Sequence, residues 1–255
     1  MTIRSPFRSL MASIAAIFVL AFVMTAPQGV AAQSTPMAAG SCAVTLGLGA
    51  EGDACVQVIH ASPDAPAVDV YVDGGLALEG LPFGAASGWV ALPAGDHQVQ
   101  VAATGEAADT AVIDATLTLE AGVAYEVAAT GLLADITPQV FVADLSTLEP
   151  EMARIQVLHT SPDAPAVDIA VTGGDVLVPE LSFPDASGYL TVPAGAYDLE
   201  VRPAGTTDVA LALPGVELEA GTVYDVYAVG LLEDGSLNVL VVATSIDGAE
   251  ATPAS

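Results

Sequence analysis

The residues best suited to chemistry lie in a string that the chain contains twice. HASPDAPAVDVYVDGG begins at His60, and HTSPDAPAVDIAVTGG begins at His159. Imidazole nitrogens and carboxylate oxygens are common protein ligands of zinc and of divalent cations such as calcium. Each copy is therefore a candidate metal site, and the candidate ligands are His60, Asp64, Asp69, His159, Asp163 and Asp168.

The alternation of side chains along the flanking strands argues against these metal sites. Val58 and His60 fall on the same face of their strand, which we expect to be the core face. In the next strand Val68 is expected to face the core, so Asp69 points to solvent and away from the histidine. The second copy repeats the pattern with Asp168.

A structural interpretation of the string is favoured instead. Ser62-Pro63-Asp64-Ala65 is typical of a turn, because proline presets φ while serine and aspartate bond free backbone amides. His60 would bond the backbone of the turn or Asp64. We therefore expect a structural strand–turn–strand connection, with a metal site, for example for calcium, as the alternative. Otherwise no cofactor is expected.

The repetition continues beyond the string, so the chain contains two similar units. Leu81–Gly95 resembles Leu181–Gly195, and Leu119–Leu133 resembles Leu218–Leu232. Each unit is long enough to be a domain. The predicted boundaries are a first domain at 56–148, a linker at 149–153 and a second domain at 154–247.

The pattern within each unit predicts a β-sandwich. Short alternating segments rich in Val and Thr are separated by Gly, Pro and Asp, and long helical periodicity is absent. The expected strands of the first unit are Val56–Ala61, Ala67–Val72, Gly88–Leu92, His97–Ala102, Val112–Leu119, Ala124–Thr130 and Gln139–Asp144.

A repeated tyrosine motif narrows the type of sandwich. The form L-x-x-G-x-x-Y occurs with Gly122 and Tyr125, and again with Gly221 and Tyr224. In immunoglobulin-like domains a tyrosine near the start of strand F bonds the backbone upstream. We predict an all-β protein of two tandem immunoglobulin-like Greek-key sandwiches, with a transthyretin-like sandwich as the alternative.

The N-terminus has the pattern of a secretory signal peptide at 1–32. Arg4 and Arg8 precede the apolar stretch Leu10–Met24, and small residues favour cleavage after Ala32. An uncleaved anchor is the alternative. No later segment is apolar enough to span a membrane. We expect a secreted or cell-envelope protein that ends in a disordered tail at 248–255.

The two cysteines lie in the predicted N-terminal segment at 33–55. In an exported chain such a pair favours a disulfide, here between Cys42 and Cys55. The loop that it closes would stabilise the fold by about 3 kcal/mol in the chain-entropy model.

The charge of the chain argues against anionic partners. It contains 31 acidic and four basic residues, with a net charge of −27. Such a field repels nucleic acid and anionic lipid. Adaptation to salt and the binding of divalent cations both fit this acidity.

Two aromatic residues suggest a binding surface. Trp89 and Tyr189 occupy equivalent places in strands whose neighbouring residues take the core face. Both rings then fall on the opposite face, where they could stack on a glycan or peptide. Cover by a loop such as Leu81–Ala86 is the favoured alternative.

The strings VIHASPDAPAVDVYVDG and VLHTSPDAPAVDIAVTG, with LPAG or VPAG downstream, resemble the bacterial exported family called domain of unknown function 4397. The resemblance covers 56–145 and 155–242. It implies exported β-rich modules, often in tandem, and it supplies no catalytic residue. The sequence thus favours a non-catalytic binding, adhesion or envelope-structural protein with an extracellular protein or glycan as partner. The alternative is a metal-assisted enzyme or cation-dependent module.

Overall fold

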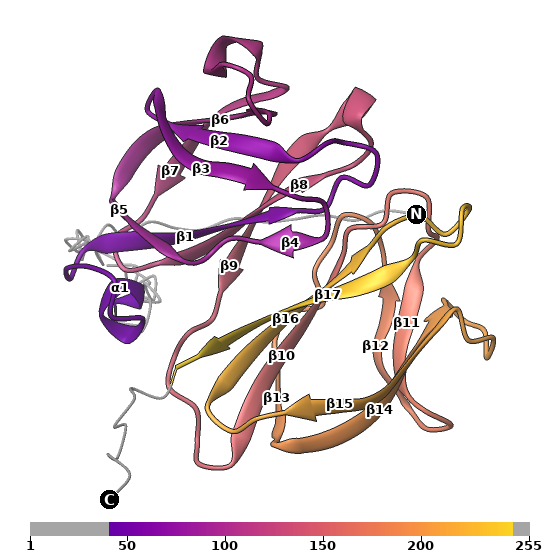
Figure 1. Cartoon of the computed structure of the whole chain (residues 1–255). Coiled ribbons are helices and arrows are strands. Elements are labelled where there is room, and N and C mark those ends of the chain that lie inside the picture. The colour runs from indigo at the N-terminus through magenta and orange to yellow at the C-terminus, as the bar shows by residue number, and fades with distance from the viewer. Residues whose placement is uncertain (1–40, 247–255) are drawn as a thin grey trace, which may run out of the picture. The chain divides into compact units, whose positions relative to one another are not determined.

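The computed structural model describes residues 41–246 and confirms an all-β protein of two tandem sandwiches (Figure 1). The expected signal peptide at 1–32, its cleavage after Ala32 and the expected tail at 248–255 lie outside the described residues. Within them, no helix is long and apolar enough to cross a bilayer.

The first sandwich contains two sheets. One sheet contains β1 (Asp53–His60), β4 (Ala85–Ala86), β5 (Val90–Pro93), β8 (Ala124–Thr130) and β9 (Thr137–Ala143), and the other contains β2 (Val68–Val72), β3 (Gly75–Leu81), β6 (Gly95–Ala103) and β7 (Ile113–Leu119). The helical turns are α1 (Cys42–Thr45), η1 (Ala108–Thr110) and η2 (Leu133–Asp135).

The second sandwich repeats this arrangement. One sheet contains β10 (Met152–His159), β13 (Leu190–Pro193), β16 (Thr222–Val229) and β17 (Asn238–Ser245), and the other contains β11 (Val167–Val171), β12 (Val176–Leu181), β14 (Gly195–Pro203) and β15 (Leu211–Leu218).

The strand order identifies the type of sandwich more closely. The first sheet runs β4-β1-β8-β9, with β5 also pairing β1, and the second runs β3-β2-β6-β7. β1 and β8 are parallel, while the other pairs are antiparallel. An immunoglobulin constant domain instead places its first, second, fifth and fourth strands in one sheet. The order therefore fits the transthyretin-like alternative better.

The apolar alternation of the strands fills the core of each sandwich. In the first, Val68 and Val70 of β2 pack with Val99 and Val101 of β6 in one buried cluster. Val58 of β1 packs against this cluster from the opposite sheet, as its position in the strand predicts. The second sandwich uses Val167, Ile169 and Val201 in the same way.

Two strands are buried on both faces. Every residue of β8 and of β16 is buried. Tyr125 packs within the first sandwich, whereas Ala124 and Ala128, which point the other way, join clusters that include side chains of the second sandwich. The sheet that contains β8 and the sheet that contains β16 therefore form a second apolar layer, which lies between the two sandwiches.

This shared layer, which we call the joint, connects the two sandwiches within one compact unit. One of its clusters contains Ile59 and Ala128 from the first sandwich with Leu158 and Tyr227 from the second. Apolar area buried in this way stabilises a fold by roughly 25 cal/mol per Å². The two repeats are therefore packed together as well as joined by a linker.

Candidate functional site

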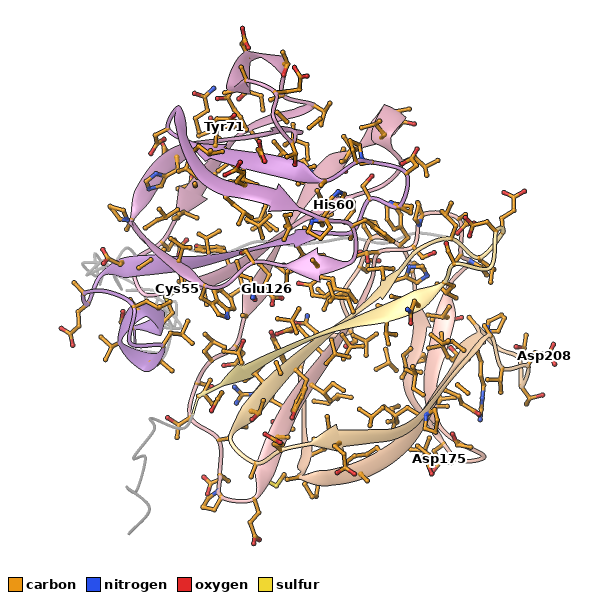
Figure 2. The ribbon with its side chains drawn as sticks, in the orientation of Figure 1. Cys55, His60, Tyr71, Glu126, Asp175 and Asp208 are labelled. Carbon is orange, nitrogen blue, oxygen red and sulfur yellow. A yellow bond between two sulfur atoms is a disulfide. The ribbon has the colours of Figure 1, made fainter. Side chains whose placement is uncertain are left out.

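The histidine of each repeated string lies buried at the end of its first strand. His60 (labelled in Figure 2) is 0% exposed, and its Nε2 donates a 2.9 Å hydrogen bond to the carbonyl of Pro66 in the following turn. Its Nδ1 accepts a 3.4 Å bond from the amide of Ser62. His159 repeats the first bond with Pro165 at 3.1 Å. Burial lowers the pKa of both imidazoles, so they are neutral near pH 7.

The first aspartate of each string connects its turn to a distant loop by hydrogen bonds. Asp64 accepts a 2.7 Å hydrogen bond from the amide of Leu133. Asp163 accepts bonds from the amides of Leu232 and Glu233 at 2.8 and 2.9 Å. These loops follow β8 and β16, so the string ties the start of each sandwich to its end.

The second aspartate of each string is not exposed to solvent, contrary to the expectation from strand alternation. Asp69 is 3% exposed and accepts bonds from the amides of Gly80 and Gly105 at 2.7 and 2.8 Å. Asp168 is 6% exposed and does the same with Glu180 and Gly205. The neighbouring strand (β3 or β12) and the loop after β6 or β14 supply these amides on the outer face, which alternation within one strand does not reveal. The backbone amides hold the pKa of both carboxyls below its usual value.

The possible ligands of each string thus have separate partners. The histidine bonds its own turn, and the first aspartate bonds the loop after β8 or β16. The second aspartate bonds one amide in β3 or β12 and one in the loop after β6 or β14. Among residues 41–246, no three His, Cys, Asp or Glu side chains form a group that could hold a metal ion.

The other residues singled out from the sequence stabilise the fold locally. Cys42 and Cys55 form a disulfide, as expected for this pair. The hydroxyls of Tyr125 and Tyr224 accept the backbone amides of Glu120 and Glu219 at 3.0 and 2.8 Å, each five residues upstream. Gly122 has a φ of 76°, a left-handed conformation that suits glycine, and Gly221 has a φ of 70°.

The two candidate binding aromatics lie half-buried beside the joint. Trp89 and Tyr189 both pack against a buried cluster that contains residues of both sandwiches. The Trp89 Nε1 donates a 3.0 Å bond to Thr244 of β17. The Tyr189 hydroxyl donates a 2.6 Å bond to Asp225 of β16. These contacts at the joint therefore contribute to their burial, and cover by the loop Leu81–Ala86 stays a prediction.

A buried polar cluster at the joint is absent from the sequence-based expectations. Glu126 of β8 (labelled in Figure 2) and Asp225 of β16 are both 0% exposed and hold equivalent places in the two repeats. The hydroxyl of Tyr227 donates a 2.7 Å bond to Oε2 of Glu126. One oxygen of each carboxyl, Oε1 of Glu126 and Oδ2 of Asp225, has no partner among the described residues.

Burial makes ionisation of both carboxyls unfavourable. Burial, reinforced by the charge of Asp225, raises the pKa of Glu126 to about 8. Burial likewise raises the pKa of Asp225 to about 6. Two carboxylates cannot both ionise at low cost in such a place. The pair can hold and release a proton, but its burial keeps substrate away.

One signal in the sequence points to this cluster. AYEVAAT and TVYDVYAV each place one acid inside an otherwise apolar and aromatic strand, at matching positions. Charged residues are seldom fully buried unless paired. An acid in both copies of a continuously apolar strand therefore indicates a buried carboxyl pair, provided that both faces of the strand are recognised as covered.

A family model matches the chain in two regions, which correspond to the two repeats. The family model described as domain of unknown function (DUF4397) matches residues 54–170 and 161–254. A comparison with curated proteins gave no significant match.

The similar solved structures have low sequence identity. The Bacillus anthracis TIE protein is 10% identical with a TM-score of 0.24, over 71% of this chain and 34% of that one. A streptococcal virulence factor that binds alpha-glucan is 10% identical with a TM-score of 0.23, over 72% of this chain and 96% of that one. The CBM26 module of Eubacterium rectale Amy13K, in complex with maltoheptaose, is 11% identical with a TM-score of 0.25, over 76% and 99%. Likeness of this degree carries no inference about ligand or activity.

Proposed function

The chain belongs to the DUF4397 family, and from this premise we propose that it is a non-catalytic binding module of an exported or cell-surface protein. One observation carries the proposal. The residues of the repeated string that could perform chemistry are each bonded to backbone groups of their own sandwich. They serve the fold, and the exposed surfaces are left for recognition. The disulfide fits an oxidising extracellular compartment.

We place the proposed contact surface at an open hollow on the second sandwich. The hollow has a volume of about 440 Å³ and lies beside β12 and the segment that leads to β13. It combines carboxylate and hydroxyl groups with aliphatic side chains, a mixture that suits a glycan or a peptide. Its lining includes Leu177, Glu180, Ser182, Asp185, Ser187 and Leu190.

The equivalent place in the first sandwich is less polar. Ala85 stands where the second sandwich has the exposed Asp185, and Pro82 stands where it has Ser182. The polar lining therefore distinguishes the second repeat from the first. This difference supports one contact surface per chain rather than two identical ones.

Retention on purified cell-wall glycan, with a surface-protein extract as the second arm, tests the proposal. We expect saturable retention of the wild-type chain in one arm and a several-fold loss in an Asp185→Ala, Leu190→Ser double variant. Asp175→Ala is the matched control, because Asp175 (labelled in Figure 2) is an exposed acid of the same sandwich that does not line the hollow. Equal retention of wild type and double variant would exclude the hollow, and no saturable retention in either arm would overturn the binding function.

The aromatic platform at Trp89 and Tyr189 stays a prediction for a second contact point. Both rings are half-buried, and their polar atoms are bonded at the joint. A substitution there would alter the joint as well as any contact with a glycan. The same retention assay on Trp89→Phe, which keeps much of the packing, would separate the two effects.

A further inference from the structure

We propose that the Glu126–Asp225 carboxyl pair is a proton-dependent latch that holds the two sandwiches together. Each sandwich supplies one carboxyl, from β8 and from β16. The latch is closed while the pair retains a proton and weakens once both carboxyls are ionised. This property goes beyond binding and does not depend on the proposed ligand.

The neighbours of the pair provide no compensating positive charge. The register places Gln57 of β1 and Phe141 of β9 beside Glu126. It places Gln156 of β10 and Val242 of β17 beside Asp225. None of these four side chains is basic, so a second negative charge would have no counter-ion among them.

The remaining ionisable groups around the pair are also accounted for. Tyr189 and Tyr227 donate their hydroxyls to the two carboxyls, and burial raises the pKa of both phenols, so they stay neutral. Arg154 lies on the same face of β10 as Gln156. Its guanidinium is engaged elsewhere, because it donates to the carbonyls of Asp144 and Ser146 and pairs with the Asp144 carboxylate at 3.1 Å.

The basic groups elsewhere in the described chain are engaged too. Arg202 pairs with Glu200, and the chain contains no lysine. His60 and His159 bond carbonyls in their own turns, while His97 pairs with Asp73. The charge that neutralises the pair is therefore a proton or an ion from solution.

A cation is the competing explanation, and the ligand count disfavours it. Four buried side-chain oxygens at the joint lack partners among the described residues. Calcium takes about six to eight oxygen ligands, and magnesium demands about six in near-ideal geometry. A shared proton needs only the two carboxyls. The four oxygens are Oε1 of Gln57, Oε1 of Glu126, Oε1 of Gln156 and Oδ2 of Asp225.

The sign of the pH effect follows from the raised pKa values. The ordinary pKa values of these groups are 4.5 for Glu126 and 3.8 for Asp225, and both are raised in the closed joint. Their contribution to stability is fully present below the ordinary values. It is lost as the pH rises through about 6 and then about 8. The joint is thus tightest in mild acid and weakest in mild alkali.

Thermal unfolding of the full chain at about pH 5 and about pH 9 tests the latch. The wild type should lose several degrees more than Glu126→Gln, because the amide keeps the shape of the neutral acid and does not ionise. Glu217→Gln, at an exposed acid of β15, is the matched control and should behave as wild type. His97 contributes equally to all three proteins, so it cancels in the comparison. Identical pH dependence in wild type and Glu126→Gln would overturn the proposal.

Two further measurements identify the charge and the movement. Carbon-13 NMR of labelled carboxyls should show a side chain that titrates above about pH 6, and its absence would contradict a shared proton. Small-angle scattering should give a larger radius of gyration at the alkaline pH for wild type but not for Glu126→Gln. An equal radius at both pH values would exclude release of the joint.

Two controls cover the remaining outcomes. If Glu126→Gln fails to fold, Asp225→Asn gives the same comparison from the other sandwich. Calcium chloride added at the alkaline pH should leave the unfolding temperature of wild type unchanged. A rise that Glu126→Gln does not share would overturn the proton in favour of a cation.

Discussion

The hydroxyl of Tyr227 donates a 2.7 Å hydrogen bond to Oε2 of Glu126, and the two side chains come from different sandwiches. Both are 0% exposed, so the bond is made away from water. In the first repeat Ala128 stands where the second has Tyr227, so the contact runs in one direction only. The joint therefore connects unequal faces of two similar domains.

Tyr227→Phe should destabilise the chain by about 1–3 kcal/mol, because it leaves a buried carboxyl oxygen without its donor. Chemical unfolding monitored by circular dichroism measures the loss. Tyr71→Phe is the control, since its exposed hydroxyl donates to the carbonyl of Glu106 and its removal should cost less. A smaller loss for Tyr227→Phe than for Tyr71→Phe would contradict the buried bond.

His97 should make stability depend on pH in the first sandwich. Its Nδ1 bonds Asp73 at 2.7 Å and its Nε2 donates to Pro93 at 2.8 Å, and Asp73 raises the pKa of the imidazole. The contribution is full below the ordinary value of 6.5 and is lost as the pH rises through the raised one.

His97→Tyr tests this pH dependence. In the second sandwich Tyr197 donates to Pro193 at 2.7 Å, so a tyrosine can replace the bond to the carbonyl but not the titration. We expect a shallower fall of the unfolding temperature between about pH 6 and about pH 8. Parallel profiles for variant and wild type would show that His97 does not stabilise the fold by its charge.

The backbone beside the second aspartates predicts opposite effects in the two repeats. Gly80 and Glu180 donate equivalent amides to Asp69 and Asp168, with left-handed φ values of 70° and 52°. This conformation costs a residue with a side chain about 1–2 kcal/mol. Gly80→Ala should therefore destabilise the chain by about 1 kcal/mol, whereas Glu180→Gly should stabilise it slightly. Differential scanning calorimetry of both variants would detect a reversed order.

Removal of divalent metal should leave the stability of the fold unchanged. His60, Asp64 and Asp69 each have backbone partners that replace metal ligation. Dialysis against EDTA should not alter the unfolding temperature, and elemental measurement should find no stoichiometric metal. A fall of several degrees that calcium reverses would restore the cation-dependent alternative for the repeated strings.

Local patterns predicted much of the fold. Alternation around Val58 and Val68, with turns between the strands, is enough to indicate two sandwiches, and an even cysteine pair indicates the disulfide. The strand Gly75–Leu81 was not expected, because its glycines interrupt the alternation. Its pairing with β2 contains shifts in register, so tertiary contacts rather than its own pattern hold it in place.

The polar sites were less predictable because they depend on what covers a strand. Alternation correctly separates Asp69 from Val68, but it cannot show that Gly80 of β3 and Gly105 of the loop after β6 donate their amides to the carboxylate. It also cannot show that the face of Glu126 meets another sandwich. Both carboxyls are buried by segments distant in sequence, and a single strand carries no information about them.

The parallel pairing of β1 with β8 has a consequence for how the chain acquires its structure. Val56 pairs with Tyr125, and Ile155 pairs with Tyr224. A strand near the start of each repeat can therefore pair only after the strand near the end of that repeat has been synthesised. Such distant pairing slows folding, since a long loop must close first. Each repeat must therefore be synthesised almost whole before its first strand gains both neighbours. Holding factors that shield apolar strands would act on the chain in that interval.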